Sequence, residues 1–302
     1  MKTYNNIIIG IDFTPWCRSA LREAVRRASL DHSTVTAIHV MDEFLSHELK
    51  KALSMDEAGI RAEWQTRLEK FIRESDLGTA QVKCEVRIGH PFTELVDACK
   101  GHAADLLIMG VKGAKGGTNR IGAIAAKCVR KAPIDVMVVR EDAQGPFKHV
   151  VVCVDFSENS AKAVQSALHV ASQDKAELDC LYVYQSALAL SLDYGGYAPP
   201  LPTSPDEDAL KMWQADLDKF VEPLVRSKGD VIVRTLVKER VNIRETILNH
   251  VEETKADIVV LGTRGKTGLR ELLIGTTAEK IVQHAPCSIL AVKPDEMSTA
   301  AE

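Results

Sequence analysis

The sequence lacks the cysteine patterns that mark disulfide-rich proteins and zinc sites. Its seven cysteines are scattered, form no CxxC pair and lie at no zinc-ligand spacing from a histidine. An odd, scattered set of cysteines is typical of thiols kept reduced in the cytosol, where most act as small buried hydrophobic residues. We therefore expect a cytoplasmic protein with no structural metal.

Long apolar runs and a basic excess are also missing. No apolar stretch approaches the roughly 18 residues that a membrane helix needs, and the short apolar run near the start ends in Asp12, unlike a signal peptide. The formal net charge is −4, and neither half of the chain has the basic excess of a nucleic-acid-binding protein. These absences argue against a membrane protein and against a nucleic-acid partner.

Sequence signatures of common enzymes are absent as well. The chain has no nucleophile elbow and no Walker glycine–lysine–serine/threonine sequence. His39, His90 and His284 have no cysteine or carboxylate partner at catalytic spacing, so we expect structural or surface histidines. We assign no catalytic residue.

What the chain does contain is an internal duplication. Two segments that each end an apolar run in Asp-Phe, at Asp12 and Asp155, are followed by alanines at the same spacing. Together with a length of 302 residues, the duplication predicts two copies of one domain, residues 1–140 and 148–294, joined by a polar Gly-Pro linker. The matching segments are residues 7–28 with 150–171, 64–71 with 213–220, and 104–110 with 256–262.

Each copy alternates short apolar runs with helical patterns. Runs without strict apolar–polar alternation favour strands that are buried on both faces, as in a parallel sheet covered by helices. The sequence therefore predicts an α/β fold of two tandem, doubly wound, five-stranded parallel-sheet domains of Rossmann type. The expected strands are residues 7–11, 35–40, 82–88, 105–109 and 134–139, then 149–154, 178–183, 231–237, 257–261 and 288–292.

A glycine turn in the second copy has the features of an anion site. Gly262 and Gly265 follow an expected strand. Glycine can adopt positive φ and lets the backbone approach a ligand closely, which any residue with a Cβ would obstruct. Residues 275–277, Gly-Thr-Thr, start the next helix, whose unpaired N–H groups and dipole favour a phosphate. Arg264 and Lys266 add positive charge. The alternative interpretation is a strand end followed by an ordinary N-cap.

Asp12 and Asp155 end the first strand of each copy, where ligands of such sheets bind. Thr14 and Ser157 are expected to cap the following helices. If their hydroxyls act as caps, each aspartate is left to hold a ribose hydroxyl or a magnesium ion carried by phosphate. The alternative is that the aspartates only support the cap.

These motifs resemble the nucleotide-binding branch of the universal stress protein family. The resemblance lies in Asp155, in the spacing Gly262-x2-Gly265-x9-Gly275-Thr276, and in the final APCSILAVK strand. It implies an adenine-nucleotide-hydrolase-like fold and bound ATP, with or without Mg²⁺. Carried over by position, Cys153 and Asp155 would lie beside the ribose and base, the Val183 backbone would read adenine, and the phosphate and ribose contacts would come from Gly262, Thr263, Arg264, Gly265, Lys266, Gly275, Thr276 and Thr277.

The first copy resembles the same family in a divergent form. Only eight residues separate Gly113 from Gly122, and Ala123 replaces the serine or threonine of the motif. We expect one nucleotide per chain, although the basic turn leaves weaker anion binding open. Residues 186–205, a proline-rich insertion in the second copy, are interpreted as a mobile loop or as a lid over the site.

The family resemblance also implies association through the last strands. Residues 134–139 and 289–292 would then pair within one chain as an internal pseudo-dimer, and a further homodimer is allowed. The favoured function is a cytoplasmic stress-response protein that binds ATP in its second domain and acts as a regulator or adaptor for an unidentified protein partner. Two alternatives stay open: a slow ATPase or phosphotransferase, with Asp155 as the evident base, and a nucleotide-free scaffold.

Overall fold

The computed structural model describes most of the chain, with several gaps. The described residues are 3–112, 121–141, 143, 145–185, 207–226, 229–240, 242–265 and 274–294. The chain divides into two compact units between Gly145 and Pro146. We call residues 3–145 the first unit and residues 146–294 the second unit, and each is described by itself.

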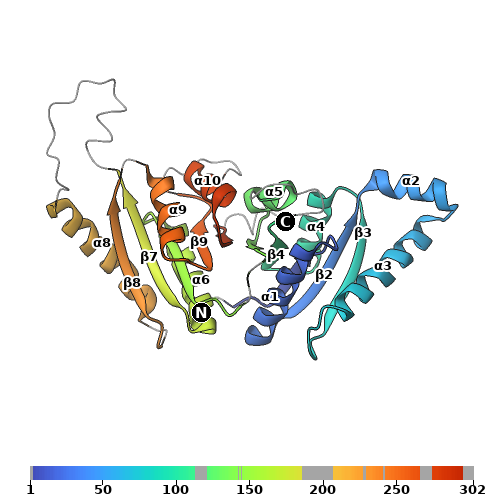
Figure 1. Ribbon diagram of the computed structural model, residues 1–302, viewed down its shortest axis with the longest axis horizontal. Helices are drawn as coiled ribbons and strands as arrows, with labels where there is room; N and C mark the ends of the chain where they lie inside the picture. The colour runs from blue at the N-terminus through green and yellow to red at the C-terminus, as the bar shows by residue number, and fades with distance from the viewer. Residues whose placement is uncertain are drawn as a thin grey trace, which may run out of the picture. The chain divides into compact units, whose positions relative to one another are not determined.

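The first unit is a parallel sheet covered by helices (Figure 1). Its strands lie in the order β3-β2-β1-β4-β5, and every neighbouring pair is parallel. Its elements are β1 (Asn6–Gly10), α1 (Pro15–Asp31), β2 (Thr34–Met41), α2 (Glu43–Leu53), α3 (Glu57–Arg73), β3 (Val82–Ile88), α4 (Pro91–Gly101), β4 (Leu106–Gly110), α5 (Ala123–Lys131) and β5 (Asp135–Val139).

The second unit repeats this architecture. Its strands lie in the order β10-β9-β6-β7-β8, again all parallel, and α8 and α9 lie on opposite sides of the sheet (Figure 1). Its described elements are β6 (His149–Val154), α6 (Glu158–Asp174), β7 (Glu177–Tyr184), α8 (Glu207–Val225), β8 (Val233–Glu239), α9 (Ile243–Glu253), β9 (Ile258–Gly262), α10 (Thr276–His284) and β10 (Ser288–Val292).

The central strands of both sheets are buried on both faces. Ile7, Ile8 and Ile9 of β1 are at most 1% exposed, and residues 150–152 of β6 are completely buried. Apolar runs without alternation are the pattern that such strands require. The predicted α/β fold with five parallel strands in each copy is therefore confirmed, whereas the predicted pairing of the last strands concerns the relation between the units and stays a prediction.

The strand order reverses beside the first strand of each unit. In the second unit, β6 lies between β7 and β9, so the chain leaves β6 toward one side of the sheet and returns on the other. The carboxyl ends of two such strands flank a crevice in doubly wound folds. The end of β6 and the end of β9 therefore position the predicted site. Among the described helices, none is long and apolar enough to cross a membrane.

Candidate functional site

The loop after β6 holds Asp155 in a tight hydrogen-bonded turn. Its Oδ1 accepts hydrogen bonds from the Ser157 backbone N–H at 3.0 Å and from the Ser157 hydroxyl at 2.6 Å. The residue between them, Phe156, has φ +60°, a left-handed conformation that is costly for a bulky side chain. Oδ2 makes no hydrogen bond to any other described residue, and the side chain is half-exposed.

The two units differ in how this turn caps the next helix. Ser157 Oγ accepts a hydrogen bond from Ser160 N at 3.1 Å, so it caps α6 as expected. Thr14 occupies the N-cap position of α1, but its hydroxyl donates to Asp12 Oδ1 at 2.6 Å and caps no N–H. The expectation of a capping hydroxyl is therefore correct for the second unit and wrong for the first. In each aspartate Oδ1 accepts the hydrogen bonds of the turn, and Oδ2 takes no part in them.

Gly265 lies directly against the remaining oxygen of Asp155. A Cβ at Gly265 would lie 2.6 Å from Asp155 Oδ2, closer than side chains tolerate. Neither Gly262 nor Gly265 has positive φ, so the turn does not use that freedom of glycine. Glycine is required here for close approach, not for a left-handed turn.

Asn159, near the start of α6, packs against the glycine turn and bonds to it. A Cβ at Gly262 would lie 2.8 Å from its Nδ2. Nδ2 donates to the backbone oxygens of Arg264 and Val292, each at 3.3 Å. Asn159 is 5% exposed, and its Oδ1 has no hydrogen-bond partner in the described part of the chain. Sequence reasoning missed this residue, although the first copy has Trp16 at the matching position, which was a usable signal.

Some hydrogen-bonding groups of the glycine turn already bond to other parts of the protein. Thr263 is 3% exposed, and both its backbone N–H and its hydroxyl donate to the Val292 carbonyl, at 3.0 and 3.3 Å. The Gly275 N–H donates to the Thr263 carbonyl at 3.0 Å. The hydroxyl hydrogen of Thr263 and the backbone N–H of Gly275 therefore cannot donate to a ligand. Both drop out of the predicted phosphate contacts.

The start of α10 is the part of the turn that stays open. Thr276 is exposed and Thr277 is half-exposed, and neither side chain makes a hydrogen bond to another described residue. The first N–H groups of a helix have no acceptor within the helix. Around Gly275, with φ −58°, a Cβ would meet no described atom within 4 Å. The structure therefore leaves donors and space at the position where the sequence predicts phosphate.

Two further predicted residues lie on neighbouring strands. Cys153 of β6 is half-buried, and burial, with smaller contributions from Cys287 and Asp155, raises the pKa of its thiol to about 12, so it stays protonated. Val183 of β7 is 5% exposed. Lys266 lies outside the described residues, as does the predicted lid, residues 186–205.

The first unit has a matching turn, but different side chains pack against it. Gly122 N donates to the Val111 carbonyl at 2.7 Å, as Gly275 does to Thr263. Trp16 takes the place of Asn159, and the Lys112 ammonium lies 4.9 Å from the centre of its ring. A bulky ring and an amine thus stand where the second unit has a small amide. Gly113 lies outside the described residues.

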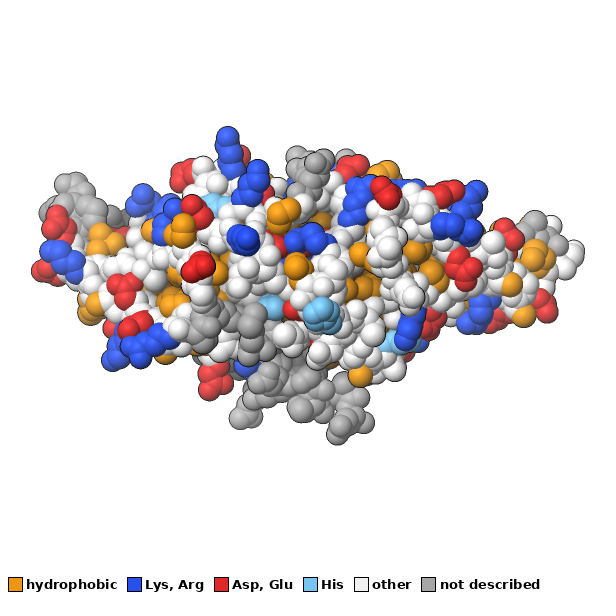
Figure 2. All heavy atoms as spheres, turned by 90° about the horizontal axis from the view of Figure 1, so that it is seen from below, with side chains coloured by type: hydrophobic (Ala, Val, Ile, Leu, Met, Phe, Trp, Pro, Cys, Tyr) orange, Lys and Arg blue, Asp and Glu red, His pale blue; other side chains and the backbone are white. Residues whose placement is uncertain are grey.

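A charge cluster around the buried Asp179 lies at the start of the strands of the second unit, opposite the predicted site. Asp179 accepts from Arg234 Nε at 2.7 Å, from His149 Nε2 at 3.0 Å and from His250 Nε2 at 3.1 Å. Burial alone would raise the pKa of Asp179, but these hydrogen bonds hold it well below its usual range. Figure 2, seen from below relative to Figure 1, shows histidine side chains at the surface. Sequence reasoning missed this cluster because its members come from four different elements.

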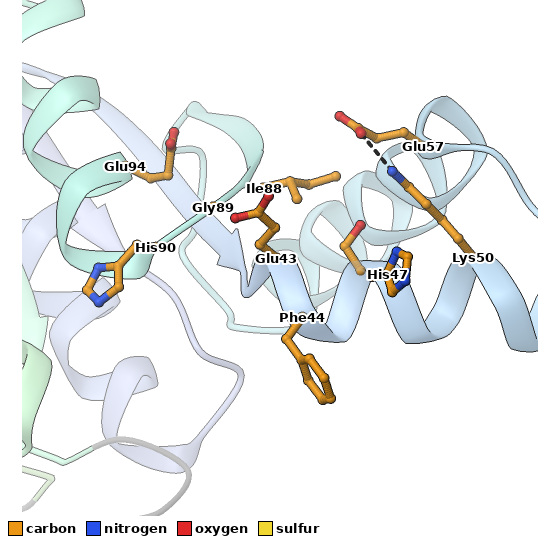
Figure 3. A pocket seen from close by; sticks show the side chains of 10 residues that line it. Glu43, Phe44, His47, Lys50, Glu57, Ile88, Gly89, His90 and Glu94 are labelled. Atoms are coloured by element: carbon orange, nitrogen blue, oxygen red, sulfur yellow. Dashed lines mark hydrogen bonds and ion pairs between the residues drawn. The ribbon is translucent and has the colours of Figure 1, made fainter.

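A polar cavity of about 720 Å³ lies in the first unit, beside α2 and the end of β3 (Figure 3). The ion pair of Lys50 and Glu57, at 2.8 Å, spans one side of it, and His90 contributes to the wall. Its other lining residues are Glu43, Phe44, Ser46, His47, Ile88, Gly89 and Glu94. None of the residues predicted from the nucleotide motif lines this cavity.

The remaining histidines agree with their structural interpretation. His39 is 8% exposed, and its Nδ1 lies 2.8 Å from the Ile11 carbonyl oxygen. His284 is exposed and contacts the Lys280 carbonyl of its own helix. Within the described ranges, no group of three or more His, Cys, Asp or Glu side chains is arranged to hold a metal ion.

Both units match a known protein family. A family model described as the universal stress protein family matches residues 3–140 and 146–293. Universal stress protein E of Salmonella typhi is 24% identical over 328 aligned positions, covering 100% of this chain and 98% of that protein. Universal stress protein YxiE of Bacillus subtilis is 29% identical over 154 positions, 49% of this chain and 99% of that protein. The crystal structure of a universal stress protein from Archaeoglobus fulgidus has the same fold, with a TM-score of 0.64 at 17% identity, covering 96% of this chain and 98% of that one.

Proposed function

Because the chain belongs to the universal stress protein family, we propose that its second unit binds an adenine nucleotide, expected to be ATP, as a nucleotide-dependent regulator in the stress response. The observation that carries the proposal is the approach of Gly265 to Asp155. A carboxylate with one oxygen outside its own turn stands against a glycine, which has no Cβ to clash with that oxygen, and the aspartate side chain is partly exposed. Such a carboxylate suits a ribose hydroxyl, which donates hydrogen bonds.

The start of α10 supports the phosphate end of the proposal. Thr276 and Thr277 offer hydroxyls and helix N-terminal amides beside the open space at Gly275. A single helix-dipole contact contributes roughly 0.5–1 kcal/mol, whereas micromolar affinity requires about 8 kcal/mol. The base and ribose therefore have to supply much of the binding, through Asp155, Cys153 and the backbone of Val183. A Mg²⁺ ion would enter with the phosphates.

The regulatory role follows from energetics. A nucleotide that binds one conformation or one partner-bound state more tightly shifts the population toward that state, and no chemical step is needed. We propose that the protein acts in the cytoplasm as an adaptor for a protein partner.

A matched pair of variants tests the proposal. Asp155→Asn keeps an acceptor for Ser157 but replaces the outer oxygen by a donor, whereas Asp12→Asn makes the same change in the same turn of the first unit. We expect Asp155→Asn to weaken ATP binding about tenfold or more, equivalent to about 1.4 kcal/mol, and Asp12→Asn to leave it unchanged. Mass spectrometry of the denatured, freshly purified protein should also find an adenine nucleotide.

Equal affinities in wild type and Asp155→Asn would remove the ribose contact from the proposal. Absence of ATP binding to wild-type protein, with no nucleotide retained on purification, would instead favour the scaffold. Turnover of ATP that Asp155→Asn abolishes would favour the enzyme.

A further inference from the structure

Each unit contains a cluster of aromatic rings that includes the phenylalanine just after its first strand. Four rings match between the units, and the second unit adds Tyr184, whose ring lies 6.3 Å from Tyr182 and 6.0 Å from Trp213. We call Phe13, His39, Trp64 and Phe71 the first aromatic cluster, and Phe156, Tyr182, Trp213 and Phe220 the second aromatic cluster. The two clusters share the arrangement of their phenylalanines and tryptophan. The two phenylalanines of each meet edge to face, at 5.5 Å and 85° in the first and 5.4 Å and 79° in the second. The tryptophan ring lies 5.7 Å from Phe13 and 6.0 Å from Phe156.

The first aromatic cluster is covered by the protein's own arginines. The Arg67 guanidinium carbon lies 4.8 Å from the centre of the Phe13 ring and 4.7 Å from that of Trp64. The Arg18 guanidinium carbon lies 4.4 Å from the centre of Phe71. Guanidinium groups are favoured over aromatic faces because the ring quadrupole attracts the cation.

In the second aromatic cluster, neither of the positions that match Arg67 and Arg18 carries an arginine. The helices that carry the tryptophans have the same register, because Gln65 and Gln214, one residue later, donate to the backbone of β3 and β8 at 3.0 and 3.2 Å. Asp216 therefore stands where the first unit has Arg67. Ala161 stands where the first unit has Arg18.

Two rings of this cluster, Tyr182 and Trp213, are partly exposed, and Asp216 is exposed. Within the described residues, no lysine or arginine lies over either of these two rings. Burial, followed by the negative charges of Asp155 and Asp216, raises the pKa of the Tyr182 hydroxyl. The surroundings of the rings are therefore negative in the second unit, whereas arginine makes them positive in the first.

We propose that the second aromatic cluster, with Asp216, binds a guanidinium group supplied from outside the chain. The internal counterpart defines the chemistry, because Trp64, which matches Trp213, holds the Arg67 side chain in the first unit. The guanidinium group belongs either to a free arginine-like molecule or to an arginine of a partner protein. This inference does not depend on nucleotide binding.

Nuclear magnetic resonance of the full-length protein labelled with ¹⁵N-tryptophan tests the proposal. The probes are argininamide and the peptide acetyl-Gly-Arg-Gly-amide, with their citrulline counterparts as neutral controls. We expect both arginine probes to shift the Trp213 indole signal in a saturable way, and the citrulline probes to bind at least about tenfold more weakly. The Trp64 indole signal should not respond, because Arg67 covers that ring.

Two exchange variants use the symmetry of the chain. Asp216→Arg should fill the second aromatic cluster with its own cation and weaken probe binding at least about tenfold. Arg67→Asp should open the first cluster, so that the Trp64 signal now responds. Asp216→Asn, which keeps the side-chain size, should weaken binding less than Asp216→Arg.

The two probes separate the sources of the guanidinium group. Equal affinity for argininamide and the peptide identifies a small molecule as a sufficient ligand, whereas at least about tenfold tighter peptide binding identifies a partner protein. No saturable shift at Trp213 with either probe, equal binding of citrulline, or full binding to Asp216→Arg would overturn the proposal.

Discussion

Asp179 and His149 form a buried pair whose strength depends on the charge of the imidazole. The hydrogen bond to Asp179 raises the pKa of His149 above its ordinary value near 6.5. A group whose pKa is raised in the folded state adds stability below its unfolded pKa, and that stability is lost as the pH rises through the folded value. The charged pair therefore stabilises the second unit at mildly acidic pH.

We predict that His149→Gln lowers the free energy of unfolding by about 1.5–3 kcal/mol at pH 5.5, the value typical of a hydrogen bond to a charged group, and by less at pH 8.5. Urea denaturation at the two pH values measures the difference. His284→Gln is the control, because His284 is exposed and contacts only its own helix. An equal loss at both pH values would show that the charge of His149 does not contribute.

Single residues were also where the sequence was least informative about the site. Asp155 and the glycine spacing were visible in the sequence, because they follow an apolar run at a fixed distance. The hydrogen bonds of Thr263 to Val292 and of Asn159 to the turn could not be predicted. These contacts join residues 29 and 105 positions apart, whose relation depends on the whole sheet.

At the scale of elements, the strands were predictable because burial on both faces demands continuous apolar runs. The glycine turn shows the limit of such reasoning. Glycine permits positive φ, but it also permits close contact, and only the structure distinguishes the two uses. At Gly110 a Cβ would lie 2.9 Å from the Trp16 backbone, so this glycine also serves the approach of helix to strand.

The two helix starts after β1 and β6 give a prediction about elements. Ser157 both caps α6 and supports Asp155, whereas Thr14 supports Asp12 without capping α1. We predict that Ser157→Ala destabilises the protein by about 1 kcal/mol more than Thr14→Ala, the usual value of an N-cap. Thermal denaturation of both variants measures this difference, and equal losses would contradict the capping role.

At the scale of the whole molecule, the second unit contains its own sheet, its own buried core and every predicted nucleotide contact. We therefore predict that residues 146–294 expressed alone fold cooperatively and bind ATP within about threefold of the affinity of the full chain. Denaturant unfolding and calorimetry check both points. A folded second unit that binds no ATP would show that the first unit contributes to the site.

We expect one nucleotide per chain, bound at the start of α10. Gly275 and Gly122 have nearly the same backbone angles, φ −58° and ψ 145° against φ −64° and ψ 150°, which any residue adopts. In Gly275→Leu the new side chain would enter the open space at the proposed phosphate position, and Gly122→Leu makes the same change in the first unit.

The most direct measurement is therefore a calorimetric titration of nucleotide-free protein with ATP. We predict one ATP per chain for the wild type and for Gly122→Leu, and at least about tenfold weaker binding for Gly275→Leu at unchanged thermal stability. Two ATP per chain, or wild-type affinity in Gly275→Leu, would contradict the account.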